Sequence, residues 1–311
     1  MDKTGTNEKT LKAHQPPMSI DEQIANLLSK GLTIDDEEYA RRVLNDISYF
    51  RLIKAYSLGL KAKNGDYNKN VRFEDIVQLY LFDANFRQAL FPQIEKIEIN
   101  LRCRLSNYFS AKYDVTGYEE AGNLAMPEDA FQDFYSEIQR EISRKKRTPF
   151  IINFQDNYID GKIPMYALVE VMSFGTLSKF YKNMKNEDKK AIASQYGVGY
   201  TYFESWLENL SYVRNICAHY SRLYNAKLTK TPRLYKQYTA AGISNSRIFA
   251  TLLTIKHLLP NDRHWHDFVQ TVELLIDKYP SVKLHYIGFP QGWAEILGHG
   301  AKEDNQAKQN E

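Results

Sequence analysis

One short stretch of the chain gathers the residue types that acid–base and phosphate chemistry need. Arg214 and Asn215 are followed by His219, and Arg222 comes three residues later. A histidine can take up or deliver a proton near neutral pH, and an arginine can hold the charge that develops on phosphate oxygens. These groups would suffice for metal-independent transesterification of RNA, in which a ribose 2′-hydroxyl attacks phosphorus and a 2′,3′-cyclic phosphate forms.

The same spacing also has a simpler interpretation. An arginine and a histidine with four residues between them occur by chance in many chains, and a helical histidine is more often a packed or surface residue than a catalyst. Arg214 and His219 are the only such pair in this chain. One histidine cannot comfortably act as base and as acid on opposite sides of one phosphorus. Two copies of the chain, facing each other in a homodimer, would supply both groups.

The pair must be positioned by the element that carries it, and the stretch from 207 to 225 predicts one amphipathic helix. At about 100° per residue, the apolar side chains fall in one stripe: Trp206, Leu210, Val213 and Cys217. The polar side chains fall on the opposite face: Ser211, Asn215, His219 and Arg222. Arg214 lies on the flank, with a side chain long enough to curl toward His219. Helical geometry leaves open whether Arg214 or Arg222 does more at phosphorus.

Two other groups of charged residues could contribute to RNA binding. Glu98 and Arg102 are four residues apart in a predicted helix, so they form either an ordinary surface ion pair or a second helix's contribution to the polar row. A basic run ends the helical stretch 127–147: Arg144, Lys145, Lys146 and Arg147. This run is either a solvated helix C-terminus that complements the helix dipole or a contact to the phosphate backbone.

Helical periodicity extends through most of the chain, and no alternating strand pattern of any length is present. With 43% hydrophobic residues and only 15 Gly and 10 Pro among 311 residues, we predict an all-α fold. The expected organisation is a flexible leader (1–17), a single domain (18–297) with a core at about 72–229 and further helices at about 244–296, and a disordered tail (298–311). Pro92 should kink or break the long helix 73–113, and Gly175 should interrupt a later one.

Composition and residue spacing also bear on the partners, metal sites and location that we expect for the chain. The net charge of +3 neither demands nor excludes a nucleic-acid partner. Cys103 and Cys217 give no metal spacing and no disulfide framework. His264 and His266 point their rings in divergent directions on a helix, and no third ligand is evident, so we expect no metal and no cofactor. Without a signal peptide or an apolar run of ~18 residues, the expected location is the cytoplasm.

The helix motif belongs to a wider pattern. R-N-x-x-A-H-x-x-R-L-x-N, from Arg214 to Asn225, resembles the signature of the Abi-type abortive-infection family, the AbiD/AbiF-like phage-resistance proteins. Four further blocks resemble that family in the expected order: Ile47 to Tyr56, Phe73 to Leu90, Ile94 to Leu105 and Leu168 to Tyr181. The resemblance covers residues from about 20 to 230, and the helices after Lys230 match none of its blocks.

The resemblance implies a HEPN-class helical domain, in which an R-x4-6-H motif forms a composite ribonuclease site on dimerisation. It assigns Arg214 and His219 as the catalytic pair and Asn215 as their polar neighbour. It also implies an antiphage toxin that damages RNA and is controlled by a small non-coding RNA. Because no apolar run is long enough to span a bilayer, we expect no membrane partner. Two alternatives stay open: a non-catalytic module that grips a regulatory RNA through the same face, and a HEPN partner of a nucleotidyltransferase.

Overall fold

The structure is a computed structural model that describes residues 14, 16–259 and 263–298. Within these residues it contains helices and isolated β-bridges, and no strand. The all-α class predicted from the sequence is therefore confirmed. The expected leader (1–17) and tail (298–311) lie almost wholly outside the described residues.

The chain divides into two compact units, and the boundary falls between Tyr80 and Leu81, inside helix α3. Helix α1 (Ile20–Ser29) begins at a capping box, in which Ser19 and Glu22 each accept from the other's backbone N–H. The first unit holds α1 (Ile20–Ser29), α2 (Glu37–Asp46), the π-helical turn η1 (Phe50–Lys54) and the start of α3.

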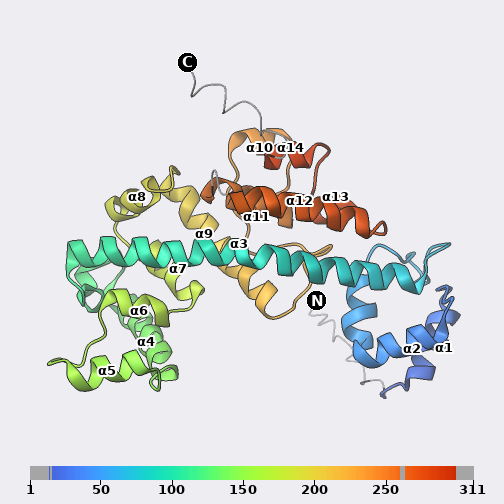
Figure 1. Cartoon of the computed structure of the whole chain (residues 1–311), viewed down its shortest axis with the longest axis horizontal. Coiled ribbons are helices and arrows are strands. Elements are labelled where there is room, and N and C mark those ends of the chain that lie inside the picture. The colour runs from blue at the N-terminus through green and yellow to red at the C-terminus, as the bar shows by residue number, and fades with distance from the viewer. Residues whose placement is uncertain (1–13, 15, 260–262, 299–311) are drawn as a thin grey trace, which may run out of the picture. The chain divides into compact units, whose positions relative to one another are not determined.

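Helix α3 (Phe73–Tyr113) is the longest element of the chain (Figure 1). It continues through Pro92, so a break at that residue is not observed. An interior proline costs about 3 kcal/mol, whereas each fully buried Leu, Ile or Phe side chain contributes about 1.5–3 kcal/mol. Apolar residues on both sides of the proline are almost fully buried: Phe82, Phe86, Leu90, Ile94, Ile97, Leu101 and Leu105. Their burial outweighs the missing hydrogen bond.

The second unit is a bundle in which three helices pack against α9 (Tyr200–Ala218): α7 (Phe174–Asn183), α8 (Asn186–Ser194) and α11 (Ile248–Leu258). The interruption expected at Gly175 lies at Met172 and Ser173 instead, because the Ser173 side chain accepts from the Thr176 N–H and caps α7. The elements after α3 are η2 (Gly117–Glu119), η3 (Ala121–Asn123), α4 (Glu128–Arg144), α5 (Pro149–Asn157), α6 (Met165–Val171), α7 (Phe174–Asn183), α8 (Asn186–Ser194), α9 (Tyr200–Ala218), α10 (Lys236–Ala240), α11 (Ile248–Leu258), α12 (Arg263–Lys278), α13 (Leu284–Ile287) and α14 (Trp293–Leu297).

Helix α9 carries the arginine and histidine of the motif, and its apolar stripe is buried as predicted: Trp206, Leu210, Val213 and Cys217. The prediction of one helix as far as Asn225 is wrong, because α9 ends at Ala218 and His219 is its C-cap. Tyr220 then takes a positive φ of 57°, which no helix contains. Arg222 therefore belongs to the following loop and not to a helical row.

The loop at Lys230 and Arg233 and the helix α11 contact the buried side of α9. The indole Nε1 of Trp206 donates to the Arg233 carbonyl at 2.7 Å, and the Asn209 amide donates to the Lys230 carbonyl at 2.7 Å. The ring of His257, from α11, stacks on Trp206 at a centroid distance of 5.7 Å. These contacts satisfy the indole N–H of Trp206 and an amide N–H of Asn209 and hold the helix in place, whereas Asn209 Oδ1 is buried with no hydrogen-bond partner among the described residues. Among the described helices, none is both long and apolar enough to cross a membrane.

Candidate functional site

Arg214 is held on the side of α9 that faces α3. Its Nε lies 3.5 Å from Oε2 of Glu98, and its guanidinium lies over the Phe91 ring at 5.7 Å from the centroid. Both contacts attract the guanidinium, one through the opposite charge of Glu98 and the other through the aromatic quadrupole of Phe91. The side chain keeps 35% of its surface exposed. It is therefore anchored by α3 yet open to a ligand.

Glu98 also pairs with Arg102, so one carboxylate serves two arginines. The side chains of Glu98 and Arg102 are only 10% and 12% exposed, which rules out an ordinary surface ion pair. The pair is therefore largely buried, and Glu98 reaches Arg214, which lies on the flank of the predicted polar row. Nη1 of Arg102 is buried and has no hydrogen-bond partner among the described residues.

A cavity of about 290 Å³ opens beside these three side chains. Arg144 and Lys145 line it, whereas their neighbours Lys146 and Arg147 do not. The basic run is thus divided between a cavity wall and open surface, and no local pattern in the run indicates where the division falls. The full lining is Glu98, Arg102, Glu141, Arg144, Lys145, Val171, Met172, Ser173 and Arg214. We call it the cationic cavity.

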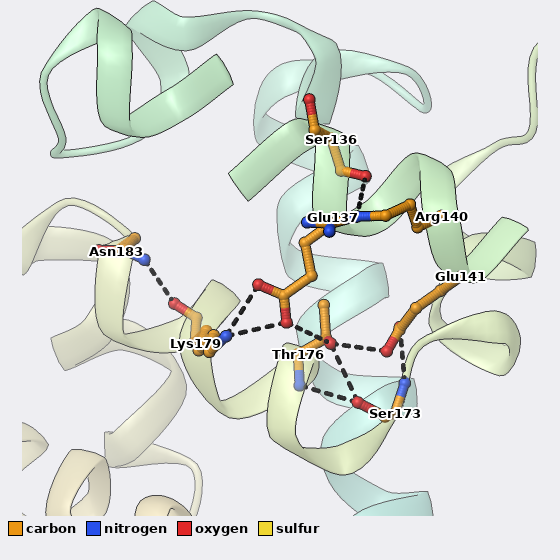
Figure 2. Close-up of polar contacts among 8 residues, drawn as sticks. All are labelled: Ser136, Glu137, Arg140, Glu141, Ser173, Thr176, Lys179 and Asn183. Carbon is orange, nitrogen blue, oxygen red and sulfur yellow. Dashed lines mark hydrogen bonds and ion pairs between the residues drawn. The ribbon is translucent and has the colours of Figure 1, made fainter. Parts of the chain in front are cut away.

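One wall of the cationic cavity is fixed by a network between α4 and α7 (Figure 2). Glu141 accepts from the Ser173 N–H at 2.9 Å and from the Thr176 hydroxyl at 2.9 Å, so both of its oxygens are engaged. Glu137 completes the network by accepting from Lys179 and, at 3.4 Å, from Thr176. Because Glu141 sits at the N-terminus of α7, the helix dipole offsets its negative charge. Glu141 and Ser173 were not anticipated from the sequence.

His219 lies apart from this cavity lining, at the C-cap of α9. Its side chain is exposed and makes no hydrogen bond with any residue that the structure describes, and the same holds for the Asn215 side chain. Only the backbone joins the two, through the His219 N–H and the Asn215 carbonyl at 3.0 Å. No hydrogen bond links Arg214 to His219 in the described part of the chain, so the expected curl of Arg214 toward His219 is not observed.

The loop after His219 is held by a buried acid that sequence reasoning missed. Asp83 is fully buried, pairs with Arg87, and accepts from the Leu223 N–H at 3.1 Å and the Tyr224 N–H at 2.8 Å. Arg222 bends back and donates to the Tyr224 carbonyl at 2.6 Å. A signal was present, because Asp83 and Arg87 are charged residues four apart on the buried face of α3.

Two other residues of the motif region, Ser211 and Cys217, are buried and therefore not accessible to a ligand. Ser211 is buried, with 9% exposure, and donates to the Glu208 carbonyl at 3.2 Å, so it does not belong to an open polar face. Burial raises the pKa of the Cys217 thiol to about 12, which keeps it protonated and unreactive. Within the described residues, no cluster of three His, Cys, Asp or Glu side chains is arranged to hold a metal ion.

Comparison with known families agrees with the resemblance seen in the sequence. A family model described as Abi-like protein matches residues 42–225, more than half of the chain. The chain belongs to this family. Searches of curated proteins and of solved structures found no match. Membership in the Abi-like family supports a role in abortive infection. The matched region contains the whole cationic cavity and His219, and it ends before α10.

Proposed function

We propose that this Abi-like protein is a metal-independent endoribonuclease of the HEPN type that acts in the cytoplasm as an antiphage toxin. The observation that carries the proposal is the placement of His219. Its imidazole is exposed and unpartnered among the described residues, five residues along α9 from Arg214. That separation is about 7.5 Å along a helix axis. Five residues also turn a helix by about 140°, so His219 supplies a proton-transfer group on another face from the four cations that line the cavity and can hold phosphate.

The proposed step needs a base and an acid. The base removes the proton of a ribose 2′-hydroxyl, the 2′-oxygen bonds to the adjacent phosphorus, and the bond from phosphorus to the 5′-oxygen breaks. The acid then protonates the leaving 5′-oxygen, which leaves a 2′,3′-cyclic phosphate and a 5′-hydroxyl. Each chain offers one exposed motif histidine, so we propose that His219 of two chains acts at one site in a homodimer, with Arg214 and Asn215 beside it. Neither a metal nor a cofactor takes part in this step.

The deciding experiment compares RNA cleavage by the wild type with His219→Ala and Arg214→Ala, in EDTA, with the product ends analysed. We expect cyclic phosphate and 5′-hydroxyl ends from the wild type and a loss of at least ~100-fold in His219→Ala, since general acid–base groups contribute 10²–10⁴-fold. His264→Ala is the matched control, because it removes another exposed histidine. The proposal fails if concentrated wild-type protein, freed of bound RNA, leaves diverse RNAs uncut.

A second candidate is a non-catalytic module that grips a small regulatory RNA. The observation that favours it is the hold of Glu98 on Arg214, which in a single chain turns the arginine away from His219. The same cations would then bind RNA without cutting it. This alternative predicts that RNA co-purifies with the protein, seen as excess absorbance at 260 nm. It also predicts that His219→Ala changes the affinity for RNA, and that neither the wild type nor any variant produces cyclic phosphate ends.

A further inference from the structure

We infer that the cationic cavity is a binding site for one phosphate of the RNA strand, next to the phosphate that reacts. This inference rests on the proposed function, and it adds a subsite that the histidine–arginine motif does not define. Arg214 is the only motif residue in the cavity lining. The other cations come from different elements: Arg102 of α3, Arg144 of α4 and Lys145, the residue that caps α4.

The charge balance of the cavity favours an anion. Four cationic side chains line it against two carboxylates, Glu98 and Glu141. Glu98 is shared between Arg102 and Arg214, and Glu141 is occupied by the N-terminus of α7 (Figure 2). Positive charge is therefore in excess where the cavity opens. A phosphate diester, with one negative charge and two non-bridging oxygens, is the ligand that arginine pairs bind best.

Several donors of the cavity are still free to bind that ligand. Arg102 Nη1 is buried and forms no hydrogen bond with the described residues, whereas Arg214 Nε already lies 3.5 Å from the Glu98 carboxylate. Arg144 is exposed and makes no hydrogen bond or ion pair in the described part of the chain. Lys145 Nζ donates only to the Glu170 carbonyl, at 3.2 Å. A buried guanidinium nitrogen without an acceptor is unusual in folded proteins, and an entering phosphate would supply the acceptor that Arg102 Nη1 lacks.

The size of the cavity fits this ligand. Its volume of about 290 Å³ equals roughly ten waters at ~30 Å³ each in the liquid. A phosphate group with several of its waters can therefore enter without moving the wall formed by α4 and α7. Val171 and Met172 line one side of the cavity. Their apolar surface keeps part of the site away from bulk water and strengthens the attraction between the cations and the phosphate.

The basic run supplies a matched test. Arg144→Ala with Lys145→Ala removes two charges from the cavity, and Lys146→Ala with Arg147→Ala removes two charges from the adjoining surface. All four side chains are exposed, so both double variants should fold and melt like the wild type. For a short single-stranded RNA, we expect the cavity variant to raise KM at least ~10-fold with a smaller change in kcat. Its plot of log(kcat/KM) against log[salt] should lose ~0.7 of slope relative to the control, the value for one phosphate contact.

Equal shifts in both double variants would overturn the inference, because the run would then act only as a diffuse positive field. If the wild type cleaves no RNA, the proposed function fails separately, and the same comparison is made on the equilibrium affinity for uncut RNA. If the cavity variant binds RNA as tightly as the surface variant and with the same salt slope, the inference of a phosphate site in the cavity is wrong. Weaker binding by the cavity variant alone would support it even without cleavage.

Discussion

Arg214 of α9 and Glu98 of α3 lie 3.5 Å apart, between Nε and Oε2. Glu98 is 10% exposed and also holds Arg102, so it fixes the direction of both guanidinium groups. The pair explains why Arg214 faces the cationic cavity and not His219. In a working site, Arg214 either acts from this position on phosphate in the cavity, or it is released from Glu98 when a second chain or RNA arrives.

Glu98→Gln tests what the shared carboxylate does. The variant keeps the shape but removes the charge that holds two arginines, so we expect the free energy of unfolding to fall by about 2 kcal/mol, in the range for hydrogen bonds to charged groups. RNA cleavage should fall as well, because Arg214 loses its anchor. Urea unfolding measures the first effect and initial cleavage rates measure the second.

The control for that prediction lies on the same helix. Glu95 is exposed, and Glu95→Gln should change stability by less than about 0.5 kcal/mol, as surface substitutions usually do. Faster cleavage by Glu98→Gln would mean that Glu98 restrains Arg214 and does not position it. An effect as small as that of Glu95→Gln on both measurements would show that the contact between Glu98 and Arg214 is incidental.

Asp83→Asn should release the loop that follows His219. Asp83 is fully buried and binds the Leu223 and Tyr224 amides as well as Arg87. Breaking a buried ion pair by removing one charge costs about 3–5 kcal/mol. We expect a loss of stability of that order, together with faster hydrogen exchange at the Leu223 and Tyr224 amides.

The comparison for Asp83→Asn is Asp133→Asn, which neutralises an exposed aspartate on α4. It should leave both stability and exchange near wild-type values. Slow exchange at the two loop amides in Asp83→Asn, despite reduced stability, would show that the loop is held by other contacts. The anchoring role given to Asp83 would then be wrong.

The sequence predicted those features that depend on local periodicity. The all-α class and the buried stripe of α9 both follow from residue spacing along one element, and both are observed. The spacing of Glu98 and Arg102 also identified a real pair. What spacing could not provide was their burial or their partner Arg214, because these depend on how α3 and α9 pack.

The missed features depend on contacts between residues far apart in sequence. Helix α9 ends at Ala218. In the loop that follows, the amides of Leu223 and Tyr224 bind Asp83, about 140 positions earlier in the chain. A further helical turn would use these backbone amides for its own hydrogen bonds, so it competes with the buried Asp83 carboxylate. Nothing in the local pattern from 207 to 225 indicates that competition. Which residues of the basic run line the cavity likewise depends on where Met172 and Ser173 separate α6 from α7 and complete the cavity lining.

His257 should make stability depend on pH. Burial, and next the charge of Lys256, lower its pKa below the ordinary value of 6.5. Above pH 6.5 the ring is neutral whether the chain is folded or unfolded, whereas below it the unfolded chain gains a proton that the folded chain resists. Stability is therefore lost as pH falls from 6.5 toward the folded pKa, by up to ~1.4 kcal/mol per pH unit.

His257→Gln should remove that part of the slope, since glutamine does not titrate and can still accept from the Tyr238 hydroxyl, which lies 3.0 Å from Nε2 in the wild type. The measurement is the free energy of unfolding by urea at intervals from pH 7.5 to 5.5. His264→Gln, at an exposed position, serves as the control and should keep the wild-type slope. Parallel slopes for the wild type and His257→Gln would contradict the prediction.

Mixing experiments can test whether two chains build each catalytic site. If both copies of His219 are needed, a mixed dimer of wild type and His219→Ala is inactive, and adding an equal amount of the variant halves the activity of a fixed amount of wild type, because only about a quarter of randomly paired dimers contain two wild-type chains. RNA is kept in excess so that the variant cannot act by sequestering substrate. Assays begun before the subunits exchange should show full activity. Unchanged activity after complete exchange, in a protein that is dimeric in solution, would mean that each chain cuts RNA with its own histidine.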